Sequence, residues 1–466
     1  MNNAQRALRG GLRAATGLIV LGAAAAGTVL VTSASLPTVR NAPLSVTAST
    51  QADAVRSIVC AGSFAELGAN PRTPDAAVPT GTAAVTQVGS TDEKSELKRD
   101  VPGGTAPMVL RASGANPLGA AQTQTLDTAT LRGLTATACV EPANEQWLVG
   151  GSTALGSSST VTVGNPNTVP ATVKFSLFDT AGEVASSQTV GVLVPPGAER
   201  TVALNGFAPG RDGLAVRVES TGASVTAALG LSQTEQLSPK VADIETRQLA
   251  PSTRLVIPGP TNISGEDMHG DGDGGSAGDS SGMVVRVLAP GRDGGTATVR
   301  ALRPKGGAVE LGTVKLKAGA LGQLKVAKWP ADATAVVVTS DVPVVGGVLG
   351  TASAGGFSDG GWFAPAPEVA AGTTVAVPIV ADGQLVIAND GDSTATVSLG
   401  QGDGKQTSTV SVPAGAAVIA RAPKNAQLIS DQPVSAGVRV VKGSGIAGYP
   451  IMPGEVRART ITVFTD

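Results

Sequence analysis

The feature that most constrains this chain is one pattern that occurs three times beyond residue 146. Each occurrence has a Thr/Ala/Val segment, then a turn with Pro-Gly or Ala-Gly character, then a second apolar segment. The first segments are 171–173, 296–299 and 394–397, the turns are 194–198, 317–320 and 412–416, and the last segments are 224–229, 342–348 and 433–438. Order and spacing are kept while most side chains change, which is typical of a repeated structural unit. The repeat therefore predicts an architecture, and it names no substrate.

Composition indicates that the repeated unit is all-β. The 466 residues include 61 Gly and 30 Pro, and only 2% are aromatic. Val and Thr favour strands, while Gly and Pro favour turns. Alternating short strands with frequent turns are typical of β-sandwiches. We predict three tandem immunoglobulin-like β-sandwich repeats over 147–250, 251–362 and 363–466. A β-propeller is the alternative, although its blades recur at about half this spacing.

The N-terminus predicts a membrane segment. Arg6, Arg9 and Arg13 precede an uncharged apolar run, and basic residues before such a run stay in the cytoplasm. We interpret 1–13 as a cytoplasmic tail and 14–31 as a transmembrane anchor, or as the apolar part of a cleaved signal peptide. Both interpretations put the remainder outside the cytoplasm, tethered to the cell membrane in the first case and secreted in the second.

Residues 32–146 form a weakly patterned β region that contains both cysteines of the chain, Cys60 and Cys139. An oxidising compartment permits a disulfide, and we predict that one joins these two residues. Two buried free thiols are the alternative. Two thiols and one distant histidine are too few ligands for a typical metal site, so no metal is expected.

Several segments in this part of the chain suggest a family. They are Ile58-Val59-Cys60, Cys139-Val140-Glu141-Pro142, Trp147-Leu148-Val149-Gly150-Gly151 and Val163-Gly164-Asn165-Pro166. With these segments the chain resembles the actinobacterial secreted family called domain of unknown function 5719. That family has no established activity, so the resemblance implies a location and an architecture and transfers no site residue.

The sequence contains no convincing catalytic motif. Residues 278–282 have the form Gly-x-Ser-x-Gly, but Ser280 lies in an acidic Gly-rich loop, 264–282, with no strand before it. The single histidine, His269, precedes the serine, whereas hydrolases with this motif place the histidine after it. We predict no catalytic residue and no enzyme.

Other candidate sites are also weak. Five carboxylates of the same loop could bind Ca²⁺, but their spacing does not match known calcium loops, and a solvated acidic loop is the preferred interpretation. These carboxylates are Glu266, Asp267, Asp271, Asp273 and Asp279. Residues 400–405 approach a phosphate-binding loop without its flanking Gly and Ser/Thr, so we predict a hairpin turn and no cofactor.

The three tryptophans, Trp147, Trp329 and Trp362, could stack on sugars or fill the ends and joints of the sandwiches. The second role is favoured because other aromatic residues are scarce. A net charge of -2 without a basic stripe argues against nucleic-acid binding. We predict a non-enzymatic scaffold or binding protein of the bacterial cell envelope, with envelope proteins or polysaccharide as partners. A carbohydrate-binding protein is the alternative, and exposed aromatic residues in a row would favour it.

Overall fold

The computed structural model describes residues 18–19, 21–23, 45–49, 55–114, 116–185, 191–263, 282–401, 406–423, 425–454 and 460–464. The chain divides into two compact units, one of Met1–Gln51 with Ala458–Asp466 and one of Ala52–Arg457. In the smaller unit, β1 (Ser45–Ser49) pairs antiparallel with β35 (Thr460–Phe464). Most of the expected membrane segment 14–31 lies outside the described residues. Among those that are described, no helix is long and apolar enough to cross a membrane.

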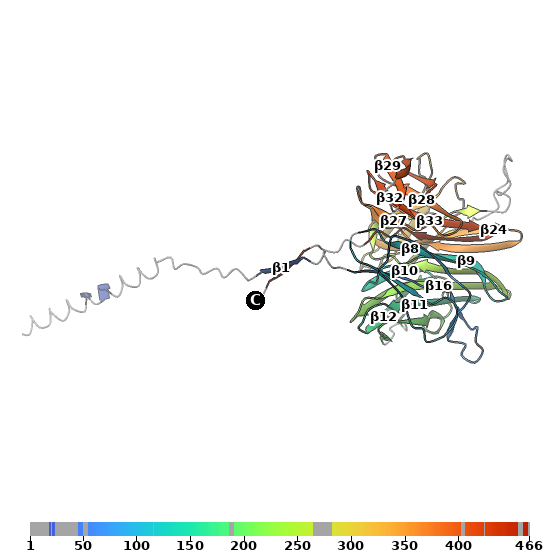
Figure 1. The fold of residues 1–466 in the computed structure, drawn as a ribbon, viewed down its shortest axis with the longest axis horizontal. Coiled ribbons are helices and arrows are strands. Elements are labelled where there is room, and N and C mark those ends of the chain that lie inside the picture. The colour runs from blue at the N-terminus through green and yellow to red at the C-terminus, as the bar shows by residue number, and fades with distance from the viewer. Residues whose placement is uncertain are drawn as a thin grey trace, which may run out of the picture. The chain divides into compact units, whose positions relative to one another are not determined.

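The larger unit is built of β-sheets, as the composition predicted (Figure 1). Three parts of it, which we call modules 1, 2 and 3, each consist of two sheets. The strands of module 1 are β10 (Glu145–Gly150), β11 (Ser157–Asn165), β12 (Ala171–Phe178), β13 (Val192–Val194), β14 (Ala198–Ala203), β15 (Leu214–Thr221), β16 (Thr226–Glu235) and β17 (Ser238–Thr246), with one 3₁₀ turn, η2 (Leu204–Gly206).

The strands of module 2 are β18 (Ser252–Pro258), β19 (Asn262–Ile263), β20 (Val284–Leu288), β21 (Gly295–Leu302), β22 (Val309–Leu316), β23 (Leu321–Lys325), β24 (Ala335–Ala354) and β25 (Phe357–Phe363). The strands of module 3 are β26 (Glu368–Val369), β27 (Val375–Val377), β28 (Gly383–Asn389), β29 (Ala395–Gln401), β30 (Gln406–Val412), β31 (Ala416–Ala420), β32 (Ala426–Ser430), β33 (Val434–Lys442) and β34 (Gly445–Pro450).

The three modules pair their strands in the same order. If the eight strands of module 1 are lettered a to h along the chain, its sheets have the orders a-f-c-d and e-b-g-h. Module 3 has these two orders in β27-β32-β29-β30 and β31-β28-β33-β34. In module 2, the continuous strand β24 serves as both f and g, because its first half pairs with β18 and β21 and its second half with β20 and β25.

The register of strand c is also shared. Val173, Val299 and Val397 lie on β12, β21 and β29, and each is fully buried. Alternate residues of these strands face the space between the two sheets, so the repeated Thr/Ala/Val pattern directs the same face inward in each module. The cores are built of small aliphatic side chains, as the low aromatic content requires.

Residues 56–138, expected to be weakly patterned, form a reduced version of the same module. Its strands are β2 (Arg56–Cys60), β3 (Ala65–Leu67), β4 (Ala77–Pro79), β5 (Ala84–Val88), β6 (Glu93–Glu96), β7 (Met108–Ala112), β8 (Gly119–Asp127) and β9 (Arg132–Ala138). The sheet orders β2-β7-β6 and β5-β8-β9 correspond to a-f-c and b-g-h. In the described residues of this part no strand corresponds to d or e, and β3 with β4 form an extra hairpin between a and b. We call this part the reduced module.

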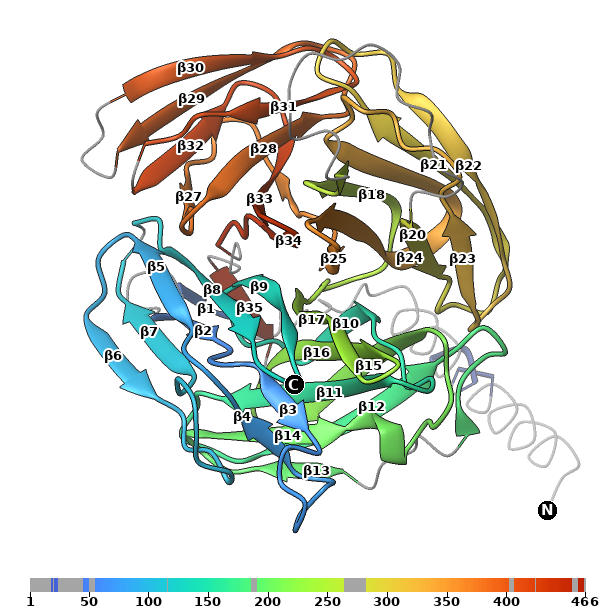
Figure 2. The same ribbon diagram turned by 90° about the vertical axis from the view of Figure 1, so that its right-hand side faces the viewer.

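The four h strands pack against each other, and we call β9, β17, β25 and β34 the axial strands (Figure 2). Neighbouring axial strands run parallel. Gly133 of β9 lies against Ala242 of β17, and further along, Ala138 N–H donates to Thr246 Oγ1. An added Cβ at Gly133 would lie 2.5 Å from the Ala242 backbone, and one at Gly361 of β25 would lie 2.6 Å from the Ile446 oxygen. Glycine at these positions lets the backbones approach directly.

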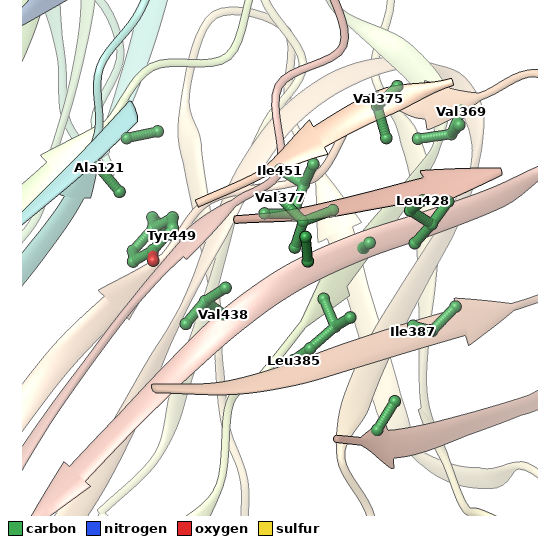
Figure 3. Packing of buried hydrophobic residues seen from close by; sticks show 14 of the residues in the cluster. Ala121, Val369, Val375, Val377, Leu385, Ile387, Leu428, Val438, Tyr449 and Ile451 are labelled. Atoms are coloured by element: carbon green, nitrogen blue, oxygen red, sulfur yellow. The ribbon is translucent and has the colours of Figure 1, made fainter. Parts of the chain in front are cut away.

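Module 3, the last along the chain, contacts the reduced module, which precedes module 1. Ala121 and Leu134 of the reduced module belong to the same buried cluster as Val377, Val438 and Tyr449 of module 3. Figure 3 shows Ala121 of β8 in this cluster together with Tyr449 of β34. The Tyr449 hydroxyl donates to Pro378 O at 2.7 Å, so the one tyrosine of the chain is satisfied within the core. The reduced module and modules 1 to 3 therefore form one closed set of packed modules.

Candidate functional site

The free edges of the axial strands lie inside the protein, and buried carboxyl groups accept hydrogen bonds from the unpaired N–H groups at these edges. An unpaired N–H at a buried edge costs free energy unless an acceptor reaches it. Asp359 Oδ2 on β25 accepts hydrogen bonds from Leu134 N of the reduced module at 3.0 Å and from Ile446 N of module 3 at 3.1 Å. One carboxyl group of module 2 thus joins two other modules.

Asp243 and Thr246 of β17 do the same for module 1. Asp243 Oδ2 accepts from Trp362 N of module 2 at 2.6 Å, and Asp243 Oδ1 accepts from Ile244 N at 2.8 Å. Thr246 Oγ1 accepts from Ala138 N and lies 2.7 Å from Thr137 Oγ1, both in the reduced module. Every axial strand therefore takes part in a hydrogen bond from a side chain to a neighbouring module.

Glu245 and Arg286 form a second buried polar group beside this axis. Glu245 Oε1 accepts from Val149 N at 3.1 Å, while its other oxygen is buried without a hydrogen-bond partner. Arg286 of module 2 donates from Nη1 to the carbonyl oxygens of Gly150 and Gly151, both at 2.6 Å, and its guanidinium lies 4.6 Å from the ring centre of Trp362. These contacts connect module 2 to strand a of module 1.

Burial shifts the pKa of each of these groups. It raises the pKa of Asp243 to about 7 and that of Glu245 to about 8, against the opposing effect of their backbone donors. Burial also raises the pKa of Asp359 well above its usual value. For Arg286, burial lowers the pKa to about 10, while Glu245 acts in the opposite direction. The carboxyl groups are therefore more easily kept neutral than exposed ones.

We call Asp243, Glu245 and Asp359 the axial carboxyls. Their side chains are occupied by backbone donors, and the three residues are only 2%, 3% and 5% exposed. A reactive acid needs access to a substrate, which this geometry withholds. In the described part of the chain, no group of three or more His, Cys, Asp or Glu could hold a metal ion. The axial carboxyls are suited to joining modules.

Buried ion pairs reinforce other seams. Arg99 Nε of the reduced module lies 2.9 Å from Glu199 Oε1 of module 1, and both side chains are buried. Burial raises the pKa of Glu199 to about 7, and Arg99 opposes this shift. Arg56 of the reduced module pairs with Glu141 of the connection to module 1. Removing one partner of such a pair would leave an uncompensated buried charge.

Two clefts follow the seams between modules. One of about 780 Å³ is lined by the connections between modules, by β18 of module 2 and by module 3, and an ion pair of Arg254 with Asp390 borders it. Another of about 600 Å³ lies between modules 1 and 2, and Trp147, Phe178 and Pro343 are among its lining residues. Among the described residues, no histidine lines either cleft.

The disulfide between Cys60 and Cys139 is present, with a Cα–Cα distance of 4.2 Å. It lies at the end of β2, beside two backbone hydrogen bonds between Val59 and Val140. In module 1, Trp147 and Gln248 make the same pair of bonds between strand a and the residues after strand h. In the reduced module, the disulfide therefore adds a covalent link between strand a and the residues after strand h. In module 1, backbone hydrogen bonds alone join these two segments.

The other predicted candidates have mixed outcomes. The acidic loop, with Ser280, His269 and the five carboxylates, lies outside the described residues, apart from Gly282. On either side of 402–405, β29 and β30 pair antiparallel. Trp147, Trp329 and Trp362 are buried, with 3%, 8% and 3% of their surface exposed. They pack at module joints and ends, which is the role that the scarcity of aromatic residues favoured.

Sequence reasoning missed the axial carboxyls. Asp243 and Glu245 occupy alternate positions in a strand segment, and Asp359 lies in a strand rich in Gly and aromatic residues. A carboxylate pair at i and i+2 places both groups on one face of a strand. That spacing was a usable signal, but only the packing of four modules shows that this face is buried.

Comparisons with known proteins identify a family but no characterised relative. No curated protein matches the chain significantly. A solved structure, a biofilm-associated protein BSP domain, aligns with 9% identity over 89% of this chain and 93% of its own, but a TM-score of 0.14 supports no argument about fold. The family described as a family of unknown function, DUF5719, matches residues 97–423. Because this match spans well over half of the 466 residues, the chain belongs to the DUF5719 family.

Proposed function

We propose that this protein is a non-enzymatic scaffold or binding protein of the cell envelope, located outside the cytoplasm and tethered by its N-terminal segment. The observation that carries the proposal is that the buried axial carboxyls, Arg286 and the Arg99–Glu199 pair connect modules to each other. Asp359 alone joins three modules. Side chains arranged in this way join the modules and are themselves out of reach of a substrate.

Two observations support the location. A disulfide persists where the compartment is oxidising, and Cys60 is bonded to Cys139. The chain enters and leaves the larger unit at neighbouring residues, since an added Cβ on Gly454 would lie 2.9 Å from Arg56 Cζ. The chain segments before Arg56 and after Gly454 thus start close together, which is compatible with attachment of the larger unit to the membrane at one point.

We also propose that modules 1 to 3 are immunoglobulin-like sandwiches repeated in tandem. Their common sheet orders and the buried Val173, Val299 and Val397 support this. An experimental structure in which the three modules superimpose strand for strand, with these valines equivalent, is the expected result. Three unlike sheet arrangements would contradict it.

The location is tested with a reporter enzyme that is active only outside the cytoplasm, fused after residue 466. Reporter activity is expected in the membrane fraction, and deletion of 14–31 should abolish it. Activity in the culture medium with a shortened N-terminus would show a cleaved signal instead. A reporter that is inactive although the fusion accumulates would contradict the extracytoplasmic location.

The alternative, carbohydrate binding, needs accessible aromatic rings. The buried tryptophans count against it, and Phe357, which is 49% exposed, is stacked under Arg132 at 3.7 Å. Affinity electrophoresis of residues 52–457 in gels containing envelope polysaccharide tests it. We expect no retardation, and retardation that is lost in Phe357→Ala would favour the alternative.

A further inference from the structure

The reduced module has an open sheet edge at β5. In modules 1, 2 and 3, strand b pairs with strand g on one side and with strand e on the other, always antiparallel. The reduced module keeps b and g, which are β5 and β8, but has no strand e. Among the described residues, the backbone of Ala84–Val88 is hydrogen-bonded only to β8.

Burial shows that this edge lacks a neighbour. The b strands of the complete modules, β11, β20 and β28, are mostly buried along their length. In β5, Ala84 is exposed, the next three residues are partly exposed, and only Val88 is buried. Three of its five residues, two Val and one Thr, favour strands.

Several other edges of the larger unit are protected in ways that β5 is not. Strand β13 has three residues, and β22 and β30 pair with a register shift. At the starts of β14, β23 and β31, a backbone N–H donates to a carbonyl oxygen of the preceding module; the donors are Glu199, Leu321 and Ala417. Strand β6, the second edge of the reduced module, carries exposed Glu93, Lys94 and Glu96. Charges, bulges and short length are the usual means of preventing strand addition, and β5 has five residues, no charge, no proline and no register shift.

We propose that the edge of β5 accepts an extended strand from another protein, in the place that strand e occupies in the complete modules. Strand addition to an open edge is a common mode of peptide recognition, in which backbone hydrogen bonds supply affinity and side-chain pockets supply specificity. The proposal rests on the binding role proposed above and assigns it a surface and a kind of partner.

The complete modules indicate what this partner strand looks like. Their e strands begin with a buried small or aliphatic residue, Ala198, Leu321 or Ala416, and each has partly exposed residues after it. The partner strand should therefore run antiparallel to β5 and begin with Ala or a similar aliphatic residue. The partly buried Val85, which packs against the core of the reduced module, would be covered by it.

A peptide that copies residues 197–205, which contain β14, is a suitable probe for the intact protein. Saturable binding is expected, together with slower amide hydrogen exchange within 84–88, and a scrambled peptide should not bind. Two N-methylated forms of the peptide, with the methyl groups on alternate residues and offset by one, separate strand pairing from side-chain contact. One form should lose at least about tenfold in affinity, and the other should bind as the unmodified peptide does.

These measurements leave the fold of the protein untouched, so misfolding of a variant cannot imitate a negative result. Absence of saturable binding, equal binding of both N-methylated forms, or protection at another edge such as 416–420 would overturn the proposal. A concentration-dependent dimer that protects 84–88 without peptide would identify a second copy as the occupant and would also refute the assignment. Because the reporter test of location is independent, an active reporter with no peptide binding would remove this inference alone.

Discussion

Three modules meet at Asp359, because its carboxyl group accepts hydrogen bonds from one buried N–H group of the reduced module and one of module 3. In Asp359→Ala both donors would lose their partner, and each unsatisfied buried donor costs about 1–3 kcal/mol. We expect the free energy of unfolding to fall by several kcal/mol in this variant, measured by chemical denaturation.

Asp341→Ala is the matched control for this residue. Asp341 also accepts a hydrogen bond from a strand N–H, that of Thr296 at 2.8 Å, but it is exposed, so water can replace it. Stability close to that of the unmodified protein is expected. Equal losses in the two variants would show that the axial position of Asp359 has no special importance.

At the scale of single elements, β24 is the strand that joins the two sheets of module 2 and also touches module 1. Its Gly347 has no room for a side chain, because an added Cβ would lie 2.6 Å from Val149 O of β10. Gly347→Ala should push β24 away from module 1 and lower the melting temperature by several degrees. Gly291→Ala is the control. A Cβ added at Gly291 would have no other heavy atom within 4 Å, and the backbone there is not left-handed, so the melting temperature should stay unchanged.

The disulfide is a second element with a measurable effect. It closes a separation of 79 residues, and cross-links of such length stabilise by about 4 kcal/mol in the chain-entropy description. The double variant Cys60→Ala/Cys139→Ala should therefore unfold at a clearly lower denaturant concentration. Reduction of the unmodified protein should produce a similar loss, and a variant as stable as the oxidised protein would show that the Val59–Val140 hydrogen bonds suffice.

At the scale of the whole molecule, stability should depend on pH in the direction set by the axial carboxyls. Folding raises the pKa of Glu245 from 4.5 to about 8 and that of Asp243 from 3.8 to about 7. A group with a raised pKa stabilises the folded state fully below its unfolded value, and the contribution is lost as the pH rises through the folded value. The free energy of unfolding should therefore fall between about pH 4 and pH 8.

Glu245→Gln provides the check on this pH dependence. The amide stays neutral, so the part of the slope that Glu245 contributes should disappear. Denaturant unfolding at several pH values measures the slope for both proteins. A stability that rises toward pH 8, or the same slope in both, would contradict the role given to these carboxyls.

The sequence predicted the all-β class and the buried registers of Val173, Val299 and Val397, because strand alternation and turn residues are local signals. It did not reveal that residues 56–138 form a reduced module, because the loss of two strands removes the turn that marks the other three modules. The axial carboxyls were missed for a different reason. A carboxylate in a strand is normally solvated, and only contacts between residues as distant as Leu134 and Asp359 bury it.

The packing of β9 against β34 has a consequence for how the chain acquires its structure. These strands end at Ala138 and Pro450, so the contact that closes the set of modules joins the first module of the larger unit to be synthesised to the last one. Until β34 is available, Leu134 has no neighbour on that side and the Asp359 carboxyl has only part of its donors. Contacts of such long range are slow to form. The axial strands of the newly made chain therefore stay partly exposed until module 3 has been synthesised.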